Sequence, residues 1–119
     1  MRYVIDHDFH IHSQISSCSR DPGQTNERIL QYAQEEGLHT IVLADHFWDE
    51  TVEGASKWYS KQNFEHISQA KPLPQSEGVK FLFGCETVEA VVPVLNAHGD
   101  CFASALIIAC RHCESHIDL

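Results

Sequence analysis

Residues 8–12 read Asp-Phe-His-Ile-His and follow an apolar, strand-like run near the start of the chain. In an extended strand, side chains two positions apart point to the same face. Asp8, His10 and His12 are therefore expected on one face of this strand. The alternate residues are mostly apolar and are expected to pack on the other face. Two imidazoles that converge from one strand, with a carboxylate behind them, predict the start of a metal-binding site.

The residues after this stretch predict a strand–helix–strand unit. The first strand is expected over residues 3–9, and a Ser-rich loop with a Pro-Gly turn follows at residues 13–24. Thr25 is suited to cap a helix of about 12 residues that ends at Gly37. Residues 39–44 form a nearly continuous apolar run, which is typical of a buried strand in a parallel sheet. The connection between the two strands is expected to be right-handed.

A second helix and a third strand are expected further along the chain. The helix is predicted over residues 54–70, and the prolines within residues 71–74 end it. The third strand is predicted over residues 79–83. The pattern changes near residue 90, where no helical or strand period is visible. We therefore divide the chain into residues 1–89, built from βα units, and a tail of unclear structure at residues 90–119.

Potential metal ligands follow all three predicted strands. They are His10 and His12, then Asp45 and His46, and finally Glu86. In a parallel array of βα units the carboxyl ends of the strands meet at one edge, so these side chains are expected to lie together. Imidazole and carboxylate together suit zinc and also tolerate manganese or iron. Asp45 is the candidate catalytic residue, placed to orient a ligating histidine or to position a water.

Composition limits the classes of partner and the compartment. The 119 residues include 17 acidic and 8 basic side chains, a formal net charge of −9, which disfavours nucleic-acid binding. Five cysteines cannot all pair within one chain, and no signal-peptide pattern opens the sequence. We therefore expect a cytoplasmic protein with reduced thiols. The longest apolar run is about half of what a bilayer-spanning helix requires, so no membrane partner is expected.

Three motifs, taken in order, are similar to those of the PHP (polymerase and histidinol phosphatase) superfamily of metal-dependent phosphoesterases. They are Asp-Phe-His-Ile-His at 8–12, Ala-Asp-His at 44–46 and Gly-Cys-Glu at 84–86. The resemblance covers roughly residues 3–89. It implies an α/β fold whose βα units belong to a distorted, seven-stranded, TIM-like β/α barrel with metals at its carboxyl edge. Because members of the superfamily are longer, the chain is expected to hold the N-terminal part, truncated after the third strand.

The resemblance also implies how the ligands are shared between metals. His10 and His12 would bind one metal, His46 would bind another, and Glu86 would bridge two. The cofactors would be divalent ions, with zinc expected first and manganese or iron as alternatives.

One ligand position stays open in the loop after the first motif. Many members of the superfamily carry a histidine or an aspartate six residues beyond the second histidine of that motif. This chain has Cys18 at that place and Asp21 nearby. Either side chain could supply the ligand.

The resemblance predicts a histidinol-phosphatase-like enzyme that hydrolyses a small phosphomonoester with a metal-activated water. An amidohydrolase-like metal hydrolase is one alternative, because that class also opens with His-x-His on its first strand. Such an enzyme would use a strand-borne lysine at its metals, whereas Lys80 lies inside the predicted third strand. A catalytically inactive fragment that acts only through binding is the other alternative, with an uncovered sheet that favours self-association.

Overall fold

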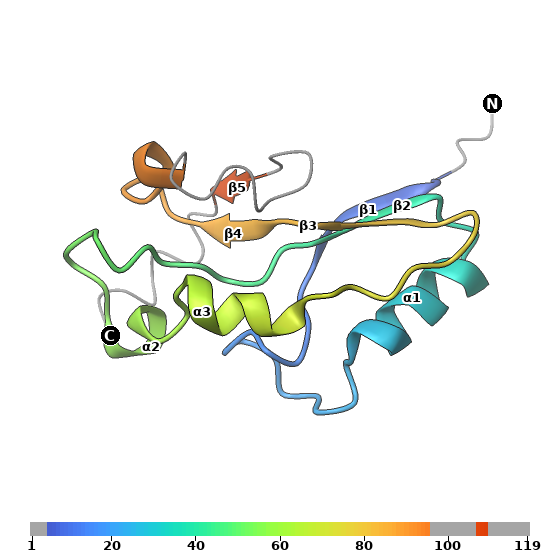
Figure 1. Cartoon of the computed structure of the whole chain (residues 1–119), viewed down its shortest axis with the longest axis horizontal. Coiled ribbons are helices and arrows are strands. Elements are labelled where there is room, and N and C mark those ends of the chain that lie inside the picture. Colours follow the sequence, from blue (N-terminus) through green and yellow to red (C-terminus); the bar gives the residue numbers. More distant parts are fainter. Residues whose placement is uncertain (1–4, 96–106, 110–119) are drawn as a thin grey trace.

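The computed structural model describes residues 5–95 and 107–109 as a mixed α/β protein. Three parallel strands form its main sheet in the order β1-β2-β3. Their bounds are β1 His7–Ile11, β2 Thr40–Leu43 and β3 Lys80–Phe83. The helices that connect these three strands lie on one side of the sheet, as Figure 1 shows. The predicted α/β class with consecutive parallel strands is therefore confirmed, and no closed barrel is present within the described ranges.

The remaining elements complete this arrangement. A single helix, α1, connects β1 to β2, and three short helical segments connect β2 to β3. A separate two-stranded parallel sheet joins β4 to β5. The bounds are α1 Asn26–Glu35, α2 Lys57–Ser60, α3 Phe64–Ile67, the 3-10 helix η1 Ser68–Ala70, β4 Cys85–Thr87 and β5 Ile107–Ala109. Most of the predicted tail, at 96–106 and 110–119, lies outside the described residues, as do the first two residues of the predicted first strand.

Strand β1 is irregular, and this overturns the predicted alternation of its faces. From Asp8 to Ile11 the strand advances three residues, while its partner β2 advances two, from Ile41 to Leu43. The extra residue is a β-bulge, which places Asp8 and Ile11 on the same side, toward α1. Phe9, expected to pack, is 40% exposed, whereas Ile11 is buried in the core.

Helix α1 forms where the sequence predicts it because its cap residues are locally encoded. The Thr25 hydroxyl accepts a hydrogen bond from the Arg28 amide at 3.2 Å, which satisfies one of the free donors of the first turn. At the other end Gly37 adopts a φ of 71°, and the Leu38 amide donates to the Ala33 carbonyl at 2.8 Å. One face of the helix is buried against the sheet, through Ile29, Leu30 and Ala33.

The prediction of one continuous helix over residues 54–70 is wrong. The chain starts a new helix at Asn63, whose side-chain oxygen accepts from the His66 amide at 2.9 Å. Ser56 caps the preceding short helix in the same way. Between them the fully buried Gln62 side chain donates to the Trp58 carbonyl and accepts from the Ser17 amide. Gln62 therefore joins the segment between the two short helices to the loop after β1.

The hydrophobic core lies between the helices and the sheet. It combines the buried face of α1 with alternate residues of β2 and β3 and with aromatic residues of the β2–β3 connection. Representative members are Ile29, Ile41, Leu43, Phe47, Tyr59, Phe81 and Phe83. Within the part of the chain that the structure describes, no helix has the length and apolar content needed to cross a membrane.

Replacement of Ile29 by alanine should destabilise the fold strongly. Ile29 is 1% exposed between α1 and the sheet, so its truncation leaves a cavity and lowers the free energy of unfolding by about 2–5 kcal/mol. Ile5 is 73% exposed, so Ile5→Ala is the matched control and should change stability by less than about 0.5 kcal/mol. Urea unfolding followed by circular dichroism measures both values. Equal effects of the two substitutions would contradict the packing of α1.

Candidate metal centre

The three parallel strands end at one level, and this brings the predicted ligands together. The Ala44 amide donates to the Ile11 carbonyl at 2.7 Å, which sets the end of β2 against the end of β1. The Gly84 amide donates to the Leu43 carbonyl at 2.8 Å, which sets the end of β3 against β2. The residues that follow each of these ends therefore form one edge of the sheet, as predicted.

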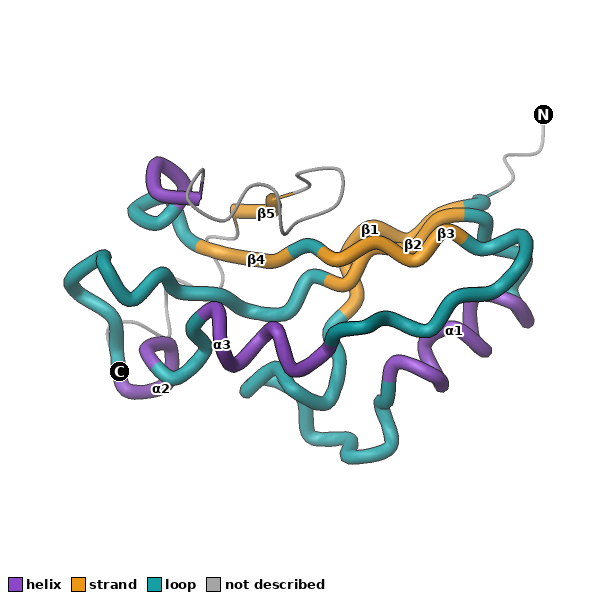
Figure 2. The backbone as a smooth tube through the Cα atoms, viewed as in Figure 1, coloured by secondary structure: helices purple, strands orange, loops and turns teal. Residues whose placement is uncertain are grey.

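Beyond Gly84 the chain keeps pairing with the residues that follow β2. Figure 2 shows that β3 leads almost directly into β4. The Glu86 amide donates to the Asp45 carbonyl at 2.9 Å, and the Phe47 amide donates to the Glu86 carbonyl at 2.8 Å. His46 and Glu86 thus form a parallel bridge. Glu86 lies within a short strand rather than in a loop, and its side chain is held beside that of His46.

One carboxylate oxygen of Glu86 is surrounded by three imidazoles. Its Oε2 atom lies 3.1 Å from Nε2 of His10, 2.9 Å from Nε2 of His12 and 3.5 Å from Nδ1 of His46. The Glu86 side chain is only 2% exposed, and His46 is also buried. The ligand atoms of His10, His12 and Glu86 lie within 4.8 Å of one another, close enough to bind one metal ion. Two nitrogen donors and a carboxylate are a donor set that zinc accepts.

A second group shares His12 and contains the thiol from the loop. The Sγ atom of Cys18 lies 3.5 Å from Nδ1 of His12, and Ser16 Oγ lies 3.3 Å from both of these atoms. Cys18, His12 and His46 form a second set whose ligand atoms lie within 4.8 Å of one another. Nε2 of His12 therefore faces Glu86, and Nδ1 of His12 faces Cys18. Of the two loop side chains left open by the sequence, the structure brings Cys18 to the site.

Asp21 lies elsewhere in the described structure. Its Oδ1 atom accepts a hydrogen bond from the Gly23 amide at 2.8 Å, and its Oδ2 atom lies 3.8 Å from the Arg28 guanidinium. These contacts hold the turn before α1.

Cys18 and His12 strongly affect each other's pKa. Burial alone would raise the pKa of the Cys18 thiol, but hydrogen bonds with His12, His46 and Ser16 outweigh it and lower the pKa to about 5. Burial alone would lower the pKa of His12, but hydrogen bonds with Cys18 and Glu86 raise it to about 10. The metal-free pair is therefore a thiolate beside an imidazolium at neutral pH. A divalent cation would replace the imidazolium proton, because ligating histidines must be neutral.

Asp45 occupies a buried place next to these groups, but its own contacts are with Ser13. One carboxylate oxygen accepts from the Ser13 amide and the other from the Ser13 hydroxyl, each at 2.6 Å. Burial raises the pKa of Asp45, and the two bonds from Ser13 partly oppose that rise. Asp45 therefore ties the loop after β1 to the end of β2. Its predicted catalytic role stays a prediction.

Four residues around the site were not predicted to belong to it. Ser13 and Ser16 orient Asp45 and His12, and the Ser-rich loop after the first motif was the only sequence signal for them. The rings of Trp58 and Tyr59 contact the ring of His46 edge-on, with centroids 5.0 and 5.9 Å away. Tyr59 belongs to the hydrophobic core and Trp58 packs against it. Their contacts show that they also fix the orientation of the His46 ring.

The fold and the site together define a mixed α/β protein with a group of histidine, cysteine and glutamate side chains that could hold a metal ion. No family model matches the chain, and no curated protein or solved structure matches it. Membership of the PHP superfamily therefore stays a prediction that rests on the three motifs.

Replacement of Ser13 by alanine should loosen the loop that carries Cys18. The substitution removes one of the two bonds to the buried Asp45 carboxylate, so it should lower the free energy of unfolding by about 1–2 kcal/mol. Ser17 has an exposed side chain in the same loop, so Ser17→Ala is the control and should be nearly neutral. Chemical denaturation compares the two. No difference between the variants would mean that the Asp45–Ser13 contact does not hold the loop.

Alkylation should distinguish Cys18 from Cys85 in the folded, EDTA-treated protein. Cys18 is exposed and its pKa of about 5 keeps it as the reactive thiolate, whereas Cys85 is buried and burial raises its pKa to about 12. The rate for Cys18 should be nearly constant between about pH 6 and 8 and fall as the pH drops below its pKa. Iodoacetamide labelling followed by peptide mass spectrometry resolves each cysteine. Rapid labelling of Cys85, or a Cys18 rate that still rises tenfold per pH unit above pH 7, would contradict the geometry.

Proposed function

We propose that the chain is a metal-dependent hydrolase of the PHP type that acts on a small phosphomonoester. The observation that carries the proposal is the buried Glu86 oxygen with imidazole nitrogens at 2.9, 3.1 and 3.5 Å. A buried carboxylate ringed by imidazoles is a costly arrangement unless a cation or protons compensate its charge. Its position at the carboxyl ends of parallel strands is where α/β folds build their active sites.

Some side chains of the site would bind metal ions, and others orient the ligands. His10, His12 and Glu86 would hold one ion, and His46 with Cys18 would hold a second. A bound ion lowers the pKa of a coordinated water to about 7 and stabilises charge on phosphate oxygens. Ser16 orients His12 through Nδ1.

The choice of a phosphomonoester and of the barrel rests on two supports. The three ordered motifs at 8–12, 44–46 and 84–86 resemble those of the PHP superfamily. The strand order β1-β2-β3, with the connecting helices on one side of the sheet, is compatible with consecutive βα units of a β/α barrel. We propose the barrel on this basis.

We propose zinc as the metal, because the donor set includes sulfur. A thiolate such as that of Cys18 favours zinc over harder ions, whereas imidazole and carboxylate alone would also accept manganese or iron. An amidohydrolase-like site fits less well, since Lys80 is the first residue of β3 and lies at the opposite end of the strand from Glu86.

A second candidate function is a catalytically inactive, metal-binding protein that self-associates. The exposed Ile5 and Phe9 at β1 favour it, because apolar side chains beside an edge strand promote association.

Replacement of Glu86 by glutamine should remove metal binding and hydrolysis together. The amide is the same size but carries no charge, so zinc affinity should fall by at least about 100-fold and hydrolysis of p-nitrophenyl phosphate should fall to background. Glu77→Gln, at an exposed position, is the matched control and should retain both properties. Elemental analysis after incubation with zinc or manganese gives the metal content, and initial rates give the activity.

The outcomes separate the two candidate functions. Metal-free wild-type protein after incubation, or Glu86→Gln that keeps its zinc, would contradict the proposed centre. Zinc that depends on Glu86, without turnover of any phosphomonoester tested, would instead favour the inactive, metal-binding protein.

A further inference from the structure

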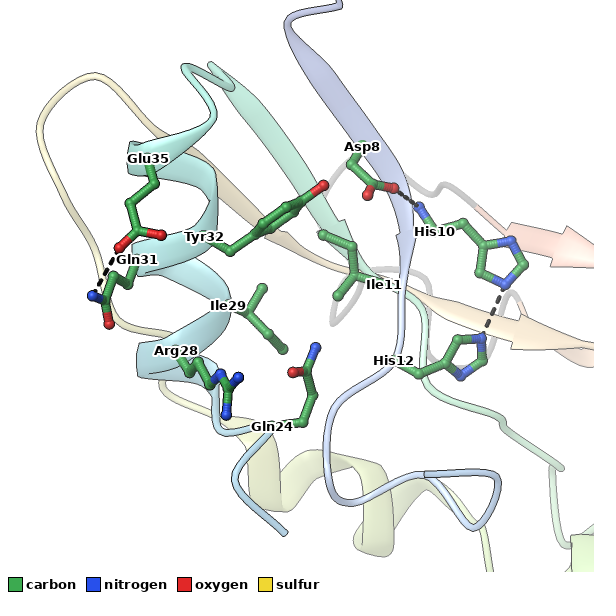
Figure 3. A pocket seen from close by; sticks show the side chains of 10 residues that line it. All are labelled: Asp8, His10, Ile11, His12, Gln24, Arg28, Ile29, Gln31, Tyr32 and Glu35. Carbon is green, nitrogen blue, oxygen red and sulfur yellow. Dashed lines mark hydrogen bonds between the residues drawn. The ribbon is translucent and has the colours of Figure 1, made fainter. Parts of the chain in front are cut away.

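A polar trough runs beside the metal centre, between β1 and α1. It is a cavity of about 630 Å³, within the range of small-molecule sites. Figure 3 shows the α1 side chains along one side of it and strand β1 along the other, with the imidazoles of His10 and His12 projecting from β1 away from α1. Ile11 and Ile29 lie between the two sides. Because His10 and His12 line the trough and also belong to the metal centre, the two sites adjoin at these residues.

The lining of the trough is too polar for a packing surface. Among the described residues that line it, Ile11 and Ile29 are the aliphatic ones, whereas the others carry carboxylate, amide, guanidinium, imidazole or phenol groups. A surface that is covered by another protein element would be expected to be apolar at its centre. Carboxylates, amides and guanidinium groups each present two hydrogen-bonding atoms in one plane, which suits a ligand with several adjacent polar atoms.

Donors and acceptors are separated along the trough. The Arg28 guanidinium and the Gln24 amide lie toward one end, and the Asp8 carboxylate and the Tyr32 hydroxyl lie toward the other (Figure 3). Within the described part of the chain, the Arg28 guanidinium forms an ion pair with Asp21 at 3.8 Å, an exposed pair that costs little to open. Asp8 uses Oδ1 to accept from the His10 amide, and its carboxylate also forms a side-chain hydrogen bond with the Tyr32 hydroxyl.

A hydroxyl-rich ligand fits this arrangement better than an apolar one. Each sugar hydroxyl both donates and accepts, so it can use Arg28 or Gln24 as donor and Asp8 as acceptor. The Tyr32 ring, which is 43% exposed, offers an apolar face for the C–H side of a sugar ring. An apolar leaving group would desolvate these polar side chains without replacing their hydrogen bonds.

We propose that the trough between β1 and α1 binds the hydroxyl-rich part of a phosphorylated sugar or polyol. This inference rests on the proposed function, because it places the phosphate at the imidazole side of the trough. Arg28 and Tyr32 are then specificity-determining residues of the hydrolase. The preferred substrate class is then a sugar phosphate, which is expected to bind more tightly than an aromatic or alkyl phosphate.

Equilibrium titration of the full-length chain tests the trough, with and without zinc. The probes are glucose 6-phosphate, inorganic phosphate, p-nitrophenyl phosphate and phosphoethanolamine. Wild-type protein should bind glucose 6-phosphate about tenfold more tightly than inorganic phosphate, which is the effect of one or two added hydrogen bonds. p-Nitrophenyl phosphate should bind no better than inorganic phosphate.

Variants of exposed residues assign the effect to the trough without threatening the fold. Arg28→Gln and Tyr32→Leu should each remove most of the tenfold preference for glucose 6-phosphate, and Tyr32→Phe should keep part of it because the ring is retained. Arg20→Gln is the matched control, since Arg20 is exposed and does not line the trough. It should keep the preference within twofold. Circular dichroism should show the same fold for all four variants.

Several results would overturn the proposal. One is equal binding of glucose 6-phosphate and inorganic phosphate. Another is a loss of the glucose 6-phosphate preference in Arg20→Gln as large as that in Arg28→Gln. A third is tighter binding of phosphoethanolamine than of glucose 6-phosphate, which would indicate an ammonium site at Asp8. The hydrolase proposal is tested separately, by the zinc content of the protein and its turnover of p-nitrophenyl phosphate. Sugar-phosphate preference in the metal-free titration would support the trough even if no hydrolysis occurs.

Discussion

The buried carboxylate of Glu86 is the constraint on which the site depends. A charged group that is 2% exposed is stable only when opposite charge or hydrogen bonds compensate for the lost water. Three imidazoles supply that compensation in the absence of a metal, with His12 held as imidazolium by Glu86 and Cys18. The same atoms are arranged for a cation that would take the place of the protons. The stability of the fold and its affinity for a metal ion therefore both depend on Oε2 of Glu86.

Backbone pairing determines which side chains meet at that oxygen. The ladder between β2 and β3 does not stop at Gly84 but continues to the bridge between His46 and Glu86. The Thr87 hydroxyl strengthens this extension by donating to the Phe47 carbonyl at 2.6 Å. This backbone pairing positions Glu86 and His46 side by side without a ligand. His10 is the most exposed of the imidazoles and has the most freedom to adjust.

The loop after β1 is the part of the centre that is built by side chains rather than by strands. Asp45 holds its first residue through Ser13, and Gln62 holds Ser17 through its amide. Between these two anchors the loop brings Cys18 to His12. The bulge in β1 has a related effect on the other side, since it turns Asp8 toward α1 while the imidazoles of His10 and His12 face the centre. The trough and the metal centre therefore adjoin along one strand and share His10 and His12.

The sequence by itself determined the elements and the ends of the strands. Apolar runs, the Thr25 cap and the Gly37 stop are local signals, and they predicted β2, β3 and α1 to within a few residues. It also predicted that His10, His12, His46 and Glu86 would meet, because parallel strands end at one edge. Tertiary structure alone decided that Cys18 rather than Asp21 joins them, that Asp45 bonds to Ser13, and that the second helix breaks before Asn63. These outcomes depend on contacts between residues 32 or 45 positions apart, such as Ser13 with Asp45 and Ser17 with Gln62. No local pattern encodes such contacts, because they form only when the packed core brings distant segments together.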